Sequence, residues 1–171
     1  MIKVIDNFLS DSDFKDLQSF IMSVTFPWYY SPVLYPKDKD YNEYNNQYYH
    51  MFWMDDEDPK MTTSPIIFEK IVPVLKKLNV TEDLLTRIKL NAQPKKFFRT
   101  LGGYHNDSDN QTTSVYYLNT NNGGTKFKKS GKVVKSVENR IVIFDSNLIH
   151  SGIFCTNKPR RFVLNLNYYE R

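Results

Sequence analysis

The 171-residue sequence has only one cysteine, Cys155, and no long apolar run. A single cysteine excludes an intrachain disulfide and a metal site made of cysteines alone. The first segment, MIKVIDNFLSDSDF, contains acidic residues and no apolar stretch as long as a signal peptide or a membrane helix requires. We therefore expect a cytoplasmic protein that does not associate with membranes.

The sequence also lacks a concentrated basic run, although Lys and Arg (23) outnumber Asp and Glu (19). Its lysines are spread along the chain, which favours a solvated surface, and no nucleic-acid-binding motif is evident. No internal repeat is visible. The sequence is instead rich in aromatic residues (15%), with 40% hydrophobic and 25% charged residues. This composition and length predict one folded domain over residues 1–171.

Helical and aromatic patterns occupy the first half, residues 1–86. We expect a strand at 1–5, a helix that follows the capping residues 10–12, and a second helix at 64–78. Pro73 lies inside the second helical pattern and is expected to kink it, because proline cannot donate a backbone hydrogen bond. This half is therefore predicted to be a helical and aromatic-loop support region.

The aromatic segment between the two helices covers residues 26–61 and includes YYHMFW. It is too long for an idle linker and too polar between its aromatics for a core strand. We expect ordered loops with short strands. With the acidic tip 55–58, residues 26–54 either cover the mouth of a site or pack on the sheet. His50 either contacts substrate or, as we favour, makes structural hydrogen bonds.

Beyond residue 86 the apolar period changes to two, which indicates strands. The candidate strands are 87–93, 96–104, 112–119, 125–128, 132–137, 140–145, 151–155 and 161–169. Short strands joined by Gly/Asn/Asp turns after two helices predict a mainly β protein with flanking helices (α+β). We expect a double-stranded β-helix, or jelly roll, over residues 87–171, braced by the N-terminal helices. The interior of such a barrel can hold a small ligand.

His105 and Asp107 stand two residues apart, so on an extended strand their side chains share one face and can converge on one ion. His150 follows the strand at 140–145 and can approach them through strand pairing. Two histidines and one carboxylate leave positions open on the ion, as an Fe(II) oxygenase requires, whereas zinc prefers a closed tetrahedron or three ligands and a water. Mn or Ni fits the same ligands. Alternatively, the segment HNDSDN is a surface turn without a metal, because its composition is typical of turns.

Arg161 opens the last predicted strand, RFVLNLNYY. Alternation places it on one face with Val163, Asn165 and Asn167. An arginine that points into a barrel requires an acidic partner, which a ligand carboxylate can supply. Alternatively, Arg160 and Arg161 form a solvent-facing basic pair.

Four blocks of sequence occur in this order: HND, TTSVYYLNTNNGGTKF, VENRIVIFDSNLIHSG and RRFVLNLNYY. Together they resemble the C-terminal core of the 2-oxoglutarate and Fe(II)-dependent oxygenases, in the prolyl-4-hydroxylase-like branch, over residues 87–169. The upstream segments FPWYY and YYHMFW are similar to those of small stand-alone members encoded by phages and marine bacteria. The resemblance implies that His105, Asp107 and His150 hold Fe(II) and act in catalysis.

The same resemblance implies a pocket for 2-oxoglutarate, with ascorbate as a supporting reductant. Arg161 matches the family's basic residue that grips the distal carboxylate of this co-substrate. Tyr117 matches a position whose hydroxyl helps to bind that carboxylate. Asn91 resembles an inward asparagine that contacts 2-oxoglutarate in some branches, and Asn165 is a weaker candidate of the same kind. Many members carry Tyr where this chain has Gln93, which suggests a rebuilt pocket.

The resemblance therefore implies a dioxygenase that hydroxylates a substrate and decarboxylates 2-oxoglutarate to succinate and CO2. The substrate, whether peptide, nucleic acid or small metabolite, does not follow from these residues. Two alternatives remain: a non-oxidative cupin-like metalloprotein and a jelly-roll ligand-binding module. The first should lack an inward arginine matched to a dicarboxylate, and the second would not need the metal ligands.

Overall fold

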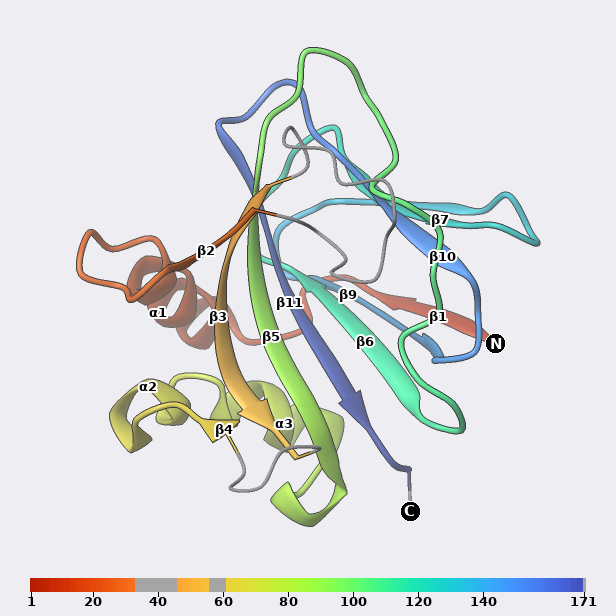
Figure 1. Ribbon diagram of the computed structural model, residues 1–171. Helices are drawn as coiled ribbons and strands as arrows, with labels where there is room; N and C mark the ends of the chain where they lie inside the picture. The colour runs from red at the N-terminus through yellow and green to blue at the C-terminus, as the bar shows by residue number, and fades with distance from the viewer. Residues whose placement is uncertain (33–45, 56–60, 171) are drawn as a thin grey trace.

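The computed structural model describes residues 1–32, 46–55 and 61–170, which form two antiparallel β-sheets flanked by helices (Figure 1). The major sheet has the order β1-β9-β6-β11-β5-β3-β2, with β4 paired to β3, and the minor sheet has the order β10-β7-β8. The major strands are β1 (Ile2–Ile5), β2 (Tyr29–Ser31), β3 (Gln47–Met54), β4 (Met61–Thr62), β5 (Leu85–Pro94), β6 (Thr112–Tyr117), β9 (Arg140–Asp145) and β11 (Arg160–Tyr168). The minor strands are β7 (Gly124–Phe127), β8 (Val133–Lys135) and β10 (His150–Ile153).

The helices pack on the face of the major sheet that is turned away from the minor sheet. Helix α1 (Asp11–Ile21) begins at Ser10, whose hydroxyl accepts a hydrogen bond from the backbone N–H of Asp13, a side-chain cap of the usual kind. The predicted second helix is divided into α2 (Pro65–Glu69) and α3 (Val72–Leu78), because Pro73 can only be accommodated at the start of a helix. A short 3-10 helix, η1 (Glu82–Leu84), leads into β5.

Two hydrophobic clusters follow from the alternation of side chains across the major sheet. The cluster on the helix side includes Leu164 and Leu166 of β11 and Leu90 of β5. The cluster between the two sheets includes Val163 of β11 and Tyr117 of β6. The predicted two-faced pattern of the last strand is therefore confirmed, as is the mainly β class with a jelly-roll core and flanking helices.

Two of the predicted elements differ from the structure. Residues 96–104 are not a strand: they run beside β10 and touch it through a single bridge, Leu101 to Ile153. The aromatic segment contains more sheet than expected, because β3 is an eight-residue strand between β5 and β2. A register shift between Met51 and Trp53 interrupts its pairing with β5.

The support region and the predicted core are joined through shared strands. β1 pairs with β9, and β3 pairs with β5, so strands from residues 1–86 extend the major sheet on both sides. The acidic tip 55–58 lies outside the described residues except for Asp55. Within the described ranges, each helix is too short or too polar to cross a bilayer.

Candidate metal centre

Backbone pairing brings the three predicted metal ligands together. His105 and His150 form an antiparallel bridge, with hydrogen bonds of 3.0 Å from His105 N to His150 O and 2.9 Å in the reverse direction. The two imidazole rings lie side by side, with centroids 4.6 Å apart. Asp107 is held by a 3.3 Å bond from its N–H to the carbonyl of Ser146, in the turn before β10. Segments more than forty residues apart in sequence thus form one cluster.

The ligand atoms of His105, Asp107 and His150 all lie within 4.8 Å of one another. His105 Nε2 is 3.4 Å from Asp107 Oδ1, and His150 Nε2 is 3.7 Å from Asp107 Oδ2. Adjacent ligands of an ion about 2.1 Å away lie about 3 Å apart, so only a small contraction would close the site on a metal. The side chain of His105 is 28% exposed and that of His150 is 6% exposed, so the cluster is open on the side of His105.

Each histidine is oriented by a backbone carbonyl. His105 Nδ1 is 3.3 Å from Gly103 O, and His150 Nδ1 is 2.9 Å from Leu148 O. A carbonyl accepts from an N–H, so in both rings Nδ1 carries the proton and the Nε2 lone pair is turned toward Asp107. This is the tautomer that a histidine needs to bind a metal through Nε2.

A chain of two hydrogen bonds fixes the carboxylate of Asp107. Thr113 of β6 donates from its hydroxyl to Asp107 Oδ2 at 3.0 Å, and Asn167 of β11 donates from Nδ2 to the same hydroxyl at 2.9 Å. Sequence reasoning missed both roles. The signal was present in part, because alternation placed Asn167 on the face of Arg161.

The electrostatics of the cluster suit a metal site. Burial would raise the pKa of Asp107, but the neighbouring His105, His150 and Arg87 side chains hold that pKa well below its usual range. Burial lowers the pKa of His150, against the opposing effect of Asp107. An ionised carboxylate beside a neutral imidazole is the protonation state that metal binding requires.

Arg161 is buried between the sheets, 2% exposed, in the same space as the cluster. Its Nη1 donates to Gln93 Oε1 at 2.8 Å and its Nη2 donates to Gly124 O at 3.1 Å, so both of these acceptors are uncharged oxygens. Arg160 points elsewhere: its guanidinium stacks 4.7 Å from the Tyr48 ring. The alternative prediction, in which Arg160 and Arg161 both face solvent, is therefore wrong for Arg161, which is buried.

Glycines leave room around this arginine. A Cβ at Gly123 would lie 3.1 Å from Arg161 Cδ and 2.5 Å from the carbonyl oxygen of Ile153, so no larger residue fits. At Gly152 a Cβ would lie 3.6 Å from Arg161 Nη1, in space that the glycine leaves empty beside the guanidinium.

Tyr117 and Asn91 lie near Arg161 on neighbouring strands. Tyr117 is fully buried, its ring is 5.6 Å from the guanidinium, and its hydroxyl donates to Thr125 Oγ1 at 2.8 Å. Burial raises the pKa of Tyr117, with Arg161 opposing the rise. Asn91 is 7% exposed, and its Oδ1 has no hydrogen-bond partner among the described residues. A buried amide without a partner is costly, so it fits a polar ligand in this space.

Asn165 and His50 occupy different positions from these residues. Asn165 faces the space between the sheets but is half-buried and pairs with Lys89 of β5, four residues along β11 from Arg161. His50 has both ring nitrogens bonded, to Pro27 O at 2.8 Å and to Thr63 Oγ1 at 2.9 Å, and it packs against the helix-side core. The structural role that we favoured for His50 therefore agrees with its contacts.

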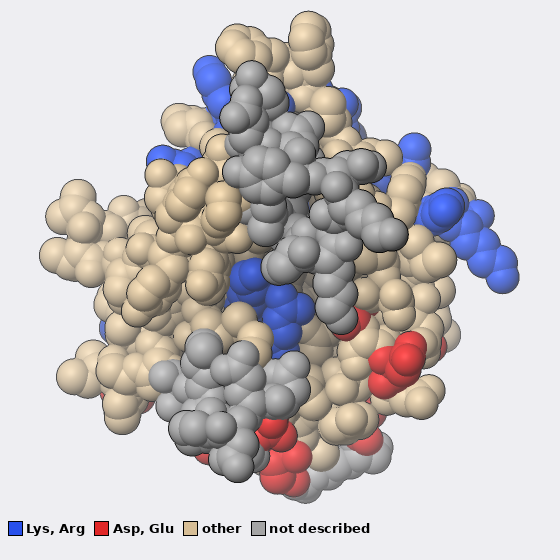
Figure 2. All heavy atoms as spheres, in the orientation of Figure 1, with Lys and Arg blue, Asp and Glu red and all other residues tan. Residues whose placement is uncertain are grey.

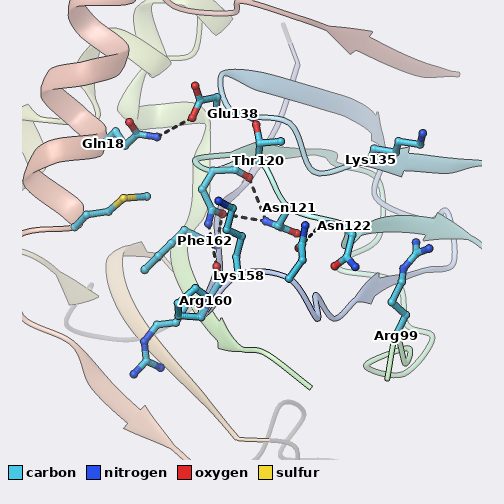
Figure 3. A pocket seen from close by; sticks show the side chains of 14 residues that line it. Gln18, Arg99, Thr120, Asn121, Asn122, Lys135, Glu138, Lys158, Arg160 and Phe162 are labelled. Carbon is cyan, nitrogen blue, oxygen red and sulfur yellow. Dashed lines mark hydrogen bonds between the residues drawn. The ribbon is translucent and has the colours of Figure 1, made fainter. Parts of the chain in front are cut away.

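A surface pocket of about 900 Å³ lies next to α1 and not at the metal cluster (Figure 3). Its lining includes Gln18 of α1 and Phe162 of β11, and the side chain of Phe162 faces the helices. Figure 3 shows the side chain of Gln18 directed toward Glu138. Arg160 lines this pocket, which places the two arginines of the predicted pair in separate environments. None of the three clustered ligands contributes to it.

Neither a family model nor a curated protein sequence matches the chain. Solved structures do. A Burkholderia pseudomallei oxidoreductase of the 2OG-Fe(II) oxygenase family superposes with a TM-score of 0.71 at 13% identity, over 98% of this chain and 84% of that one. The chain has the 2OG-Fe(II) oxygenase fold.

Two prolyl hydroxylases share this oxygenase fold. One is the Trichoplax adhaerens enzyme in complex with a hypoxia inducible factor peptide fragment, with a TM-score of 0.64 at 15% identity over 98% of this chain and 83% of that one. The other is a viral collagen prolyl hydroxylase from Paramecium bursaria Chlorella virus-1 in a 2OG complex, with a TM-score of 0.56 at 16% identity over 99% and 96%. The expected likeness to the prolyl hydroxylase branch is thus confirmed at the level of fold.

Proposed function

We propose that the protein is an Fe(II)- and 2-oxoglutarate-dependent dioxygenase. It hydroxylates a substrate and decarboxylates 2-oxoglutarate to succinate and CO2. The observation that carries this proposal is the convergence of His105, Asp107 and His150 within 4.8 Å on the inner side of an oxygenase fold. Two imidazoles and one carboxylate are the ligand set of non-haem Fe(II) oxygenases, and a closed structural zinc site would require a fourth protein ligand.

In this proposal the three residues hold Fe(II) through His105 Nε2, His150 Nε2 and a carboxylate oxygen of Asp107. When bound, Fe(II) and 2-oxoglutarate supply the oxidising chemistry that the protein's own side chains lack. The backbone carbonyls behind both histidines and the hydroxyl of Thr113 behind Asp107 keep the three ligands aimed at one point. Such preorganisation would leave a bound metal free to take further ligands from outside the protein.

Arg161 binds the distal carboxylate of 2-oxoglutarate in this proposal. Its burial supports the assignment, because a guanidinium in a space with little water binds a carboxylate strongly and in a defined orientation. Tyr117 and Asn91 line the same space and would contact the co-substrate, Tyr117 with its hydroxyl and Asn91 with its Nδ2 amide group, because the oxygens of the co-substrate accept hydrogen bonds. Gln93 contributes indirectly, since its Oε1 accepts from Arg161 and so positions the guanidinium.

The proposal is tested by binding in the absence of oxygen. Titration calorimetry should show one Fe(II) site in the wild-type protein, and 2-oxoglutarate should bind about tenfold or more tightly once this site is filled, because the keto acid completes the metal coordination. His105→Ala should abolish both effects while the circular dichroism spectrum is retained. Equal 2-oxoglutarate affinity with and without metal, or metal binding unchanged in His105→Ala, would contradict the proposal.

A further inference from the structure

Two basic side chains, Arg87 and Lys89, project from β5 into the space between the sheets. The residues that alternate with them, Ile88 and Leu90, belong to the helix-side core, so Arg87 and Lys89 share the opposite face with Asn91. Both are only partly exposed. In the orientation of Figure 1, Figure 2 shows Lys and Arg atoms at the floor of a hollow where β5 and β11 run.

The strand register places Arg87 in line with the metal ligands. Arg87 pairs with Asn167 of β11, and Asn167 pairs with Thr113 of β6, whose hydroxyl holds Asp107. Two strand spacings separate Arg87 from Thr113, or about 10 Å between their backbones, which an extended arginine side chain largely spans.

Lys89 lies one step further along the same face. It pairs with Asn165 on one side and with Met51 on the other, and its Nζ lies 4.8 Å from the centre of the Tyr49 ring. Burial and, to a lesser extent, the charge of Arg87 together lower the pKa of Lys89 to about 8. A lysine in these surroundings is held at a cost, which an anion beside it would offset.

The described residues supply no carboxylate for this pair of cations. Their ion pairs involve Lys15, Lys70, His105, Arg140 and His150, and include neither Arg87 nor Lys89. Asp107, the carboxylate that the strand register places in line with Arg87, is committed to the metal in the proposed function. No carboxylate among the described residues neutralises these two like charges on a partly buried face, and an anion from a ligand would stabilise them.

2-Oxoglutarate does not meet this requirement if Arg161 holds its distal carboxylate. Lys89 pairs with Asn165, four residues from Arg161 along β11, which corresponds to about 13 Å of strand. A five-carbon chain with bonds of roughly 1.5 Å spans about 6 Å at most. The distal carboxylate of the co-substrate therefore lies toward Arg161, and its other carboxylate is committed to the metal in the proposed function, so the two cations of β5 remain for a second molecule.

We propose that Arg87 and Lys89 bind an oxyanion of the molecule that is oxidised, so that the substrate is acidic and carries a carboxylate or phosphate group. This inference rests on the proposed function, since it assigns the substrate of that same site. A bidentate contact to Arg87 and a point-charge contact to Lys89 would hold the anion beside the open side of the ion. The C–H bond attacked then lies within a few bonds of the acidic group.

Direct binding to Lys89 tests the anion site without any turnover. Protein labelled with 13C at the lysine ε-carbon is loaded with Zn(II), a redox-inert stand-in for iron, and 2-oxoglutarate, and is then titrated with acetate or inorganic phosphate. The Lys89 signal, identified by its loss in Lys89→Met, should shift saturably in the millimolar range with at least one of the two anions. Arg87→Met should weaken this binding about tenfold or more.

Lys15 provides a matched control, because its Nζ also lies over a ring, 5.3 Å from that of Phe14, on the helix side of the sheet. Its signal should not move. A Lys89 signal that shifts no more than that of Lys15 with either anion would overturn the inference. The acetate and phosphate arms distinguish a carboxylate from a phosphate substrate.

Turnover provides the second readout. Carboxylic acids paired with their primary amides, and phosphate monoesters paired with their parent alcohols, are compared for stimulation of succinate release. The acidic member of an active pair should stimulate at least tenfold more than the neutral one, and this preference should disappear in Lys89→Met but persist in Lys15→Met. Equal stimulation by neutral members would overturn the inference. Absence of succinate in every reaction would count against the proposed function, while the Lys89 titration still decides the anion site.

Discussion

The hydroxyl of Thr113 donates a 3.0 Å hydrogen bond to Oδ2 of Asp107 and accepts a 2.9 Å bond from Asn167. The carboxylate is thereby fixed by a side chain from β6 that does not itself reach the metal position. Thr113→Val keeps the shape of the residue but removes the donor, so Fe(II) affinity should fall about tenfold, the lower end of what such supporting contacts contribute. Calorimetric titration measures this change, and Thr113→Ser should retain wild-type affinity.

Arg161 should matter for 2-oxoglutarate and not for the metal. Loss of its charge in Arg161→Met removes a charge-assisted, two-pronged contact, so the dissociation constant of 2-oxoglutarate should rise at least about 30-fold, or ~2 kcal/mol. Fe(II) affinity should not change. Arg160→Met is the control, because Arg160 stacks on Tyr48 outside the space between the sheets. Equal effects of the two substitutions on 2-oxoglutarate binding would refute the assignment of Arg161.

Lys89 should reduce stability near neutral pH. Its folded-state pKa of about 8 lies below the usual 10.5, so the unfolded chain binds the Lys89 proton more tightly and wild-type stability should rise between pH 8 and 10.5. Lys89→Met removes this penalty. We expect the variant to be about 1–2 kcal/mol more stable than wild type at pH 7, with the difference shrinking toward pH 10. Urea unfolding at several pH values measures it, and a variant less stable than wild type at pH 7 would contradict the expectation.

His50 should be structural only. His50→Ala leaves the carbonyl of Pro27 and the hydroxyl of Thr63 without their partner and opens a cavity beside Phe52. The free energy of unfolding should therefore fall by about 2–3 kcal/mol. Fe(II) and 2-oxoglutarate affinities of the folded protein should stay at wild-type values, and a loss of either without a loss of stability would indicate a role in the site.

The elements that could be predicted from the sequence are those whose pattern is strictly local. The strand Arg140–Asp145 and the cap at Ser10 follow from alternation and from helix-start chemistry, and both lie where expected. The full length of β3 was not predicted, because aromatic side chains on both of its faces hide the alternation of polar and apolar residues. The guanidinium of Arg160 stacks on the ring of Tyr48, and the ammonium group of Lys89 lies over the ring of Tyr49.

The part of the candidate site that could be predicted is the part that depends on residue type and on spacing in the sequence. His105, Asp107 and His150 were identified from a short motif and a resemblance, and their side chains do lie together. The hydrogen bonds from Asn167 and Thr113 were not predictable, because they depend on the register of three strands distant in sequence. The alignment of Arg87 with Asn167 and Thr113 is likewise a result of register.

The central claim concerns the fate of 2-oxoglutarate on a metal held by His105, Asp107 and His150. Purified protein with Fe(II), ascorbate and dioxygen should release succinate and CO2 from 2-oxoglutarate in equal amounts, slowly even without substrate. Asp107→Ala should abolish this release, since the ion loses its only carboxylate ligand from the protein. Protein that binds Fe(II) and 2-oxoglutarate yet forms no succinate, or an Asp107→Ala variant that forms it at the wild-type rate, would contradict the account.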